Sequence, residues 1–184
     1  TGAIAAWENA ARLAADGRFG ENKMRIYASQ NAPFTIMYDS WKAHSRELVP
    51  MTPEEGRQKA EVILGKVLSN RKPPYSLAGG LFDVLEKSGG DMFKVSNDEI
   101  VSWVVKYFSL EGYDLFPASA CAVSSLKQAL DAGIVKHDET VMLNVTGGGM
   151  LGATRKGFIL KEPDLILSPD LPAEEIIAAV DKLF

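Results

Sequence analysis

Apolar residues recur at three- and four-residue intervals in much of this chain, a pattern typical of amphipathic helices. In residues 3–16 these positions include Ile4, Trp7 and Ala11, and Asp16-Gly17 is a suitable helix end. Thr52-Pro53 predicts another helix start, with Thr as N-cap and Pro at the first helical position. Another helix is predicted to begin at Ser96, because Ser96 and Glu99 have the spacing of a capping box. Further helices are predicted over residues 38–48, 52–68, 79–88, 117–131 and 172–183.

Between these helices lie three short segments with the character of strands. They are residues 24–29, 91–95 and 141–145. The third is almost continuously apolar, as expected of a parallel strand that is covered on both faces. Strands separated by helices predict an α/β fold with an open, mostly parallel sheet flanked by helices.

Composition narrows the function classes. The 184 residues carry 20 Lys and Arg against 24 Asp and Glu, a net charge of −4 with the two signs mixed, which disfavours a nucleic-acid partner. A single Cys excludes a disulfide scaffold and a Cys-rich zinc site, and the two His are far apart. We expect no metal site, and no apolar run has the roughly 18–20 residues of a membrane span.

Open α/β sheets bind ligands beyond the carboxyl ends of their strands, and a glycine run lies at one such end. Thr146-Gly147-Gly148-Gly149 follows the apolar segment 141–145. This segment fits either a ligand-binding loop, in which the Thr146 hydroxyl forms a hydrogen bond to a cofactor atom, or a tight turn at the end of the strand. Thr1-Gly2, at the start of the first helix, fits either an anion site or a simple helix start.

The remaining reactive residues are interpreted as structural. Arg155 and Lys156 read as a solvated basic pair, Cys121 as a small buried apolar residue, and His44 and His137 as structural or surface groups. The chain therefore offers binding loops without a convincing catalytic acid, base or nucleophile. That combination is natural for one part of an enzyme.

Three segments resemble a known family. Residues 1–8 (TGAIAAWE) resemble the end of the phosphate-binding loop, and the helix after it, in fold-type II pyridoxal-phosphate (PLP) enzymes of the threonine synthase group. Residues 116–120 (FPASA) resemble that group's Glu-Pro-Ala-Ser-Ala segment, and Val145-Thr146-Gly147 resembles its Thr-Gly pair after a late core strand.

Three other segments narrow the resemblance to one branch of this group. Threonine synthases usually continue with His-Gly-Leu-Lys where this chain has Gly148-Gly149-Met150-Leu151. This departure, together with residues 29–34 (SQNAPF) and 70–75 (NRKPPY), is most similar to the cysteate synthases of coenzyme M biosynthesis.

The resemblance implies a PLP-dependent reaction in which O-phospho-L-serine and sulfite give L-cysteate and phosphate. It implies that Thr1 and Gly2 help to hold the cofactor phosphate, and that Thr146, with Gly147 beside it, bonds the pyridine nitrogen. Asn31 and Ala32 would line the substrate face. No catalytic residue is expected in this chain, because the lysine that carries PLP in the family has no counterpart here.

We therefore expect residues 1–184 to be the carboxyl-terminal part of a PLP-dependent catalytic domain, inactive alone, cytoplasmic, and part of a homo-oligomer as the family often is. Two alternatives stay open at this point. One is a divergent threonine synthase acting on O-phosphohomoserine. The other is a stand-alone, non-catalytic α/β module that binds a phosphorylated metabolite.

Overall fold

The computed structural model describes residues 1–158 and 161–183. The chain divides into two compact units, Thr1–Gly152 and Ala153–Phe184, which are described separately below. In the described part of the chain, no helix has both the length and the apolar character needed to cross a membrane.

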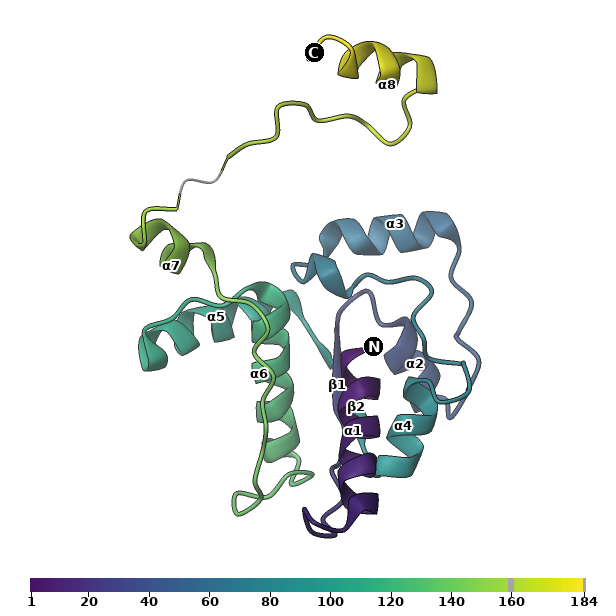
Figure 1. Ribbon diagram of the computed structural model, residues 1–184, viewed down its shortest axis with the longest axis vertical. Helices are drawn as coiled ribbons and strands as arrows, with labels where there is room; N and C mark the ends of the chain where they lie inside the picture. The colour runs from purple at the N-terminus through teal and green to yellow at the C-terminus, as the bar shows by residue number, and fades with distance from the viewer. Residues whose placement is uncertain (159–160, 184) are drawn as a thin grey trace. The chain divides into compact units, whose positions relative to one another are not determined.

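A parallel pair of strands lies at the centre of the first unit. Strand β1 (Tyr27–Asn31) pairs with β2 (Asp91–Val95), and Tyr27 lies opposite Asp91 in the register. The predicted bounds of the second strand are confirmed, whereas the first begins three residues later than the sequence predicts. Helices flank this open parallel sheet, so the predicted α/β fold class is confirmed (Figure 1).

One face of the sheet is covered by α1 (Gly2–Asp16) and α4 (Leu81–Ser88), with α2 (Ile36–Lys42) beside them. The core on this side joins Ile26 and Met92 to Val84 and Leu85, and the partly buried Trp7 of α1 packs against it. Alternate strand residues point to this face, as the period of a strand requires.

The other face is covered by α6 (Pro117–Asp131), which packs against α5 (Asn97–Glu111). Phe93 of β2 meets Ala129 of α6 there, and the rings of Tyr27 and Phe93 lie 6.0 Å apart. Helix α6 has the bounds that the sequence predicts. The capping box of Ser96 and Glu99 at the start of α5 is also confirmed.

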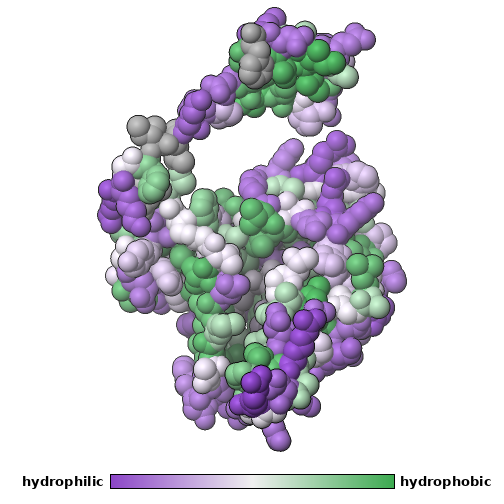
Figure 2. Space-filling view, viewed as in Figure 1, coloured by the Kyte–Doolittle hydropathy of each residue, from purple (hydrophilic) through white to green (hydrophobic). Residues whose placement is uncertain are grey.

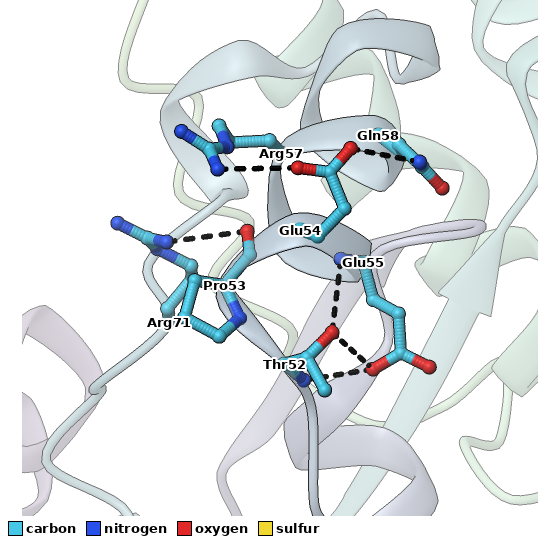
Figure 3. A network of polar contacts seen from close by, with 7 residues as sticks. All are labelled: Thr52, Pro53, Glu54, Glu55, Arg57, Gln58 and Arg71. Atoms are coloured by element: carbon cyan, nitrogen blue, oxygen red, sulfur yellow. Dashed lines mark hydrogen bonds and ion pairs between the residues drawn. The ribbon is translucent and has the colours of Figure 1, made fainter.

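Helix α3 (Pro53–Val62) begins at the predicted cap but ends earlier than predicted (Figure 3). The Thr52 hydroxyl accepts a hydrogen bond from the Glu55 amide at 3.2 Å, and a Glu55 carboxylate oxygen accepts from the Thr52 amide at 2.7 Å. The predicted continuation to residue 68 is wrong. Ile63 is extended and fully buried, and only a short 3₁₀ turn, η1 (Lys66–Leu68), follows.

The predicted strand 141–145 is wrong, because this segment does not join the sheet. It runs beside α6 without a ladder partner among the described residues. Met142 is 79% exposed, and Val141 and Val145 are exposed as well. Figure 2 shows apolar side chains on this face of the first unit. An apolar pattern makes a strand only when a neighbouring strand satisfies its backbone groups.

Two short helices complete the chain. Helix α7 (Met150–Arg155), which the sequence did not predict, lies at the boundary between the two units. In the second unit, α8 (Ala173–Val180) lies within the predicted range 172–183, with Glu174 and Glu175 in its first turn. Negative charge at a helix N-terminus suits the helix dipole.

Candidate functional site

The carboxyl end of β1 holds a glutamine with one unsatisfied hydrogen-bond donor. Gln30 is 1% exposed, and its Oε1 accepts hydrogen bonds from the backbone amides of Met37 and Tyr38 at 2.8 and 2.9 Å. Two donors on this atom identify it as the oxygen, which fixes the orientation of the amide. Its Nε2 is buried and has no partner among the described residues. A buried donor left in this way costs about 1–3 kcal/mol and calls for an explanation.

A pocket of about 180 Å³ adjoins Gln30 at the start of α1. Its lining includes Gln30, Thr1, Ile4 and Asn70. Helix α1 has no side-chain cap at Thr1 in the described structure, and the Ala5 amide donates a hydrogen bond to the Thr1 carbonyl at 3.0 Å. The start of α1, with its uncapped first amides and the positive end of the helix dipole, and Gln30 therefore border the same pocket.

Gly2 adds open space at this helix start. A Cβ placed on Gly2 would have no atom within 4 Å, so packing inside the described chain does not require glycine there. Close approach of a ligand to the backbone is one reason for such a glycine. Among the predicted cofactor residues, Thr1 lines the small pocket, whereas Gly2, next to it in the chain, lines a separate and larger space of about 700 Å³.

Asn31, predicted to face the substrate, lies at the centre of a buried hydrogen-bond network. Its Nδ2 donates to the carbonyls of Val95 and Ala32 and to Asn97 Oδ1, at 3.0–3.1 Å. Its Oδ1 accepts from the Gly65 amide at 2.8 Å. The network joins β1, the end of β2, the start of α5 and the loop before η1. Asn31 is fully buried, so it fixes the shape of this strand end, and Ala32 is the more accessible of the two predicted residues.

The glycine run lies against the start of α6. The Ser119 hydroxyl donates to the Gly147 carbonyl and accepts from the Gly147 amide, both at 3.0 Å. A Cβ on Gly149 would lie 1.9 Å from Asp114 Oδ2, so glycine is required there by the protein's own packing. Part of the run is therefore a tight turn. Thr146 is exposed just before it.

The structure groups these residues into separate places. Thr1 and Gln30 share a pocket, Asn31 and its network lie behind them at the strand end, and Thr146 and Gly147 lie at the α6 start. Gln30 was not predicted as a site residue. Its position at the carboxyl end of a strand could have pointed to Gln30 as a site residue. The backbone amides that orient its side chain belong to α2, and no local sequence pattern predicts that contact.

The other reactive residues are placed as interpreted. Cys121 is fully buried, and burial raises the pKa of its thiol to about 11, so it behaves as an apolar core residue. His44 and His137 are exposed, as are Arg155 and Lys156. Within residues 1–158 and 161–183, no three His, Cys, Asp or Glu side chains form a group that could hold a metal ion.

Comparison with known proteins gives consistent matches. No protein-family model matches the chain. A cysteate synthase from Methanosarcina acetivorans is 40% identical over 179 residues, which is 96% of this chain and 43% of that protein. One from Methanocella paludicola is 40% identical over 183 residues, 98% of this chain and 43% of that protein. One from Methanoculleus marisnigri is 45% identical over 150 residues, 81% of this chain and 35% of that protein. The chain thus spans less than half the length of these curated relatives.

Proposed function

We propose that this chain, which belongs to the cysteate synthase family over nearly its whole length, forms the carboxyl-terminal part of a PLP-dependent cysteate synthase. The family membership confirms the resemblance expected from the sequence. The proposed reaction converts O-phospho-L-serine and sulfite into L-cysteate and phosphate. The observation that carries the proposal is the 40% identity over 96% of the chain. The lysine that carries the cofactor would belong to the part of the polypeptide outside residues 1–184.

The start of α1 fits the phosphate of PLP. This end of the helix has uncapped amides and open space at Gly2, and Gln30, whose buried Nε2 has no partner among the described residues, is one of the residues that line the adjoining pocket. An anion at a helix N-terminus is stabilised by the free amides and by the helix dipole together. We assign Thr1 and Gly2 to the phosphate as backbone donors, and Gln30 as a side-chain donor on the same side.

Thr146 is proposed to bond the pyridine nitrogen, and Gly147 holds the backbone beside it. Ser119 and Phe116 both bond the Gly147 carbonyl, at 3.0 and 3.2 Å, so the residue after Thr146 is fixed to the start of α6. When bound, PLP supplies an electron sink for removing the β-substituent of the amino acid substrate. A neutral hydroxyl at the ring nitrogen suits elimination and replacement better than a carboxylate would.

Asn31 and Ala32 are proposed to border the substrate. The Asn31 side chain is engaged within the protein, so its contribution would be to hold the strand end in shape, while Ala32 and the loop after it would face the substrate. The substrates are small molecules. A His-Gly-Leu-Lys segment is absent after Thr146, which weighs against the threonine synthase substrate O-phosphohomoserine.

The cofactor assignment is tested in the complete polypeptide with Gln30→Glu. This change keeps an acceptor for the Met37 and Tyr38 amides but replaces the donor Nε2 by an oxygen. We expect the Kd for PLP to rise about 5- to 150-fold, the equivalent of about 1–3 kcal/mol, in a titration followed by cofactor absorbance. The exposed Gln58→Glu is the matched control and should bind PLP normally. An unchanged Kd in Gln30→Glu removes Gln30 from the site.

The reaction is tested by offering the complete polypeptide O-phospho-L-serine with sulfite and, separately, O-phosphohomoserine. Release of phosphate that depends on sulfite supports the proposal. Threonine formed from O-phosphohomoserine would instead favour the divergent threonine synthase. Binding of a phosphorylated metabolite without any turnover would favour the non-catalytic module.

A further inference from the structure

The loop between η1 and α4 adds a polar residue to the small pocket at the start of α1. Asn70 and Pro73 of this loop line the pocket of about 180 Å³ together with Thr1 and Gln30. Tyr75, directly after the loop, is fully buried, so this end of the loop is fixed to the core. Asn70 itself is exposed. The loop therefore presents Asn70 to a ligand that enters the pocket.

The Asn70 side chain is oriented by its own loop. Its Oδ1 accepts a hydrogen bond from the Lys72 amide at 3.0 Å, which is the contact of an Asx turn. Because an oxygen must accept that bond, the other end of the side-chain amide is the donor Nδ2. This Nδ2 has no hydrogen-bond partner within residues 1–158 and 161–183. Pro73 follows, and its fixed φ restricts the turn further, so Asn70 offers two donor hydrogens from a restrained position.

Gln30, which also lines the pocket, has its oxygen engaged in the same way. The Met37 and Tyr38 amides bond its Oε1, and its buried Nε2 has no partner in the described part of the chain. Both side-chain amides of the pocket can therefore offer only donors to a ligand. None of the described residues that line the pocket is acidic. Hydrogen-bond donors with no carboxylate among them, beside the first amides of a helix, favour an anion.

Both substrates of the proposed reaction are oxyanions. The phosphate of O-phospho-L-serine carries about −1.5 to −2 charge near pH 7, and sulfite is an anion as well. The proposed function assigns Thr1, Gly2 and Gln30 to the cofactor phosphate, so Asn70 remains as a donor for a second anion. Lys72 is exposed and makes no ion pair with the described residues. Its positive charge beside the turn favours the approach of such an anion.

We propose that Asn70 is a specificity-determining residue that binds the oxyanion of each substrate in turn. Its Nδ2 donates a hydrogen bond to a phosphate oxygen of O-phospho-L-serine and, after phosphate has left, to an oxygen of sulfite. One donor serves both anions because sulfite bonds to the same carbon that phosphate leaves. The proposal rests on the proposed function for the identity of the substrates, and it adds the residue that selects them.

The test measures the binding of inorganic phosphate to the complete, PLP-loaded polypeptide by isothermal titration calorimetry. Asn70→Asp keeps the oxygen that accepts from the Lys72 amide and replaces the donor Nδ2 by a carboxylate oxygen. We expect the Kd for phosphate to rise at least about tenfold, the equivalent of about 1.4 kcal/mol. Asn70→Ala removes the donor without adding charge, so its Kd should rise less. An unchanged Kd in Asn70→Asp overturns the proposal.

The order of the two variants separates ligand binding from a structural role. If Asn70 only held the turn, Asn70→Ala would be the more damaging change, because Asp retains the bond to the Lys72 amide. A larger rise of the Kd in Asn70→Ala than in Asn70→Asp therefore also overturns the proposal. The control Gln58→Glu adds the same charge at an exposed position of α3 and should bind phosphate like the wild type.

Steady-state kinetics and a cofactor titration extend the test to the reaction. In Asn70→Asp the KM values for O-phospho-L-serine and for sulfite should both rise, whereas the Kd for PLP should change less than the Kd for phosphate. A larger effect on PLP than on phosphate would place Asn70 at the cofactor and overturn the proposal. The phosphate titration needs no turnover, so a polypeptide that shows the Asn70 effect but forms no L-cysteate would refute the proposed function alone. An active polypeptide without the Asn70 effect would refute this inference alone.

Discussion

Replacing Asn31 with Asp should destabilise the protein more than replacing it with Ala. The Asn31 side chain is fully buried, and its Nδ2 faces three acceptors, the carbonyls of Val95 and Ala32 and the Oδ1 of Asn97. Asp has the same shape and keeps the oxygen that accepts from Gly65. Its second oxygen, however, would meet those three acceptors without a proton to share.

The structure allows a magnitude for each change. In Asn31→Ala the Val95 carbonyl still accepts from the Ala32 amide and Asn97 Oδ1 still accepts from the Leu64 amide. The Gly65 amide loses its Asn31 acceptor, which predicts a loss of about 1–3 kcal/mol. In Asn31→Asp an uncompensated buried charge predicts a loss of about 3–5 kcal/mol near neutral pH.

The dependence on pH separates this cause from a loss of packing. Burial among acceptors raises the pKa of the new carboxyl in the folded state above its unfolded value of about 3.9. The unfolding free energy of Asn31→Asp therefore falls as the pH rises from about 4 through the folded-state pKa, since the folded form then binds the extra proton. Asn31→Ala lacks this group and should show no such added dependence.

Urea denaturation at pH 4 and pH 7, followed by circular dichroism, measures both effects. Asn70→Asp is the control, because Asn70 is exposed and its oxygen, which accepts from the Lys72 amide at 3.0 Å, is retained. Its change should stay within about 0.5 kcal/mol. If Asn31→Asp is as stable as the wild type at pH 7, or no less stable than Asn31→Ala, the assigned network is wrong.

Three further predictions follow from single contacts. Gly149→Ala places a Cβ 1.9 Å from Asp114 Oδ2 and should lower the unfolding free energy, measured by urea denaturation, by about 1–3 kcal/mol. Gly148→Ala is the control and should be tolerated, because the nearest atom to its Cβ would lie at 3.8 Å. Equal losses of stability in the two variants would contradict this packing. Burial raises the pKa of Cys121 to about 11, so the unfolding free energy should fall as the pH rises above about 8.5, where the thiol of the unfolded chain ionises. Cys121→Ala should remove this dependence on pH. The same dependence of the unfolding free energy on pH in both proteins would refute the prediction. Ser96→Ala removes the N-cap of α5 and should lower the unfolding free energy by about 1 kcal/mol, and an unchanged urea midpoint would count against the cap.

Local chemistry made part of the fold predictable. The capping box at Ser96, the Thr52 cap and the Pro at the start of α6 depend on residues within one helical turn of each other, and all three are confirmed. The helix from Thr52 ends early for a reason that is not local. Ile63 is buried against Phe34 and Ile36, and this packing holds it in an extended conformation.

The segment 141–145 shows a second reason why the sequence pattern did not predict the structure. Its apolar pattern is that of an inner strand, but a strand also needs neighbours for its backbone groups, and the described residues do not provide one. The candidate site also depends on contacts between residues that are distant in the sequence. Asn31 bonds residues 34 and 66 positions away, and Gln30 is oriented by α2, so neither arrangement could be read from neighbouring residues.

Product analysis on the complete polypeptide tests whether this chain is part of a cysteate synthase. The complete polypeptide, with PLP, is given O-phospho-L-serine and isotopically labelled sulfite, and the products are identified by mass spectrometry. We expect L-cysteate that carries the labelled sulfur, formed in equal amount to the phosphate released. Absence of labelled L-cysteate from a polypeptide that binds PLP would contradict it.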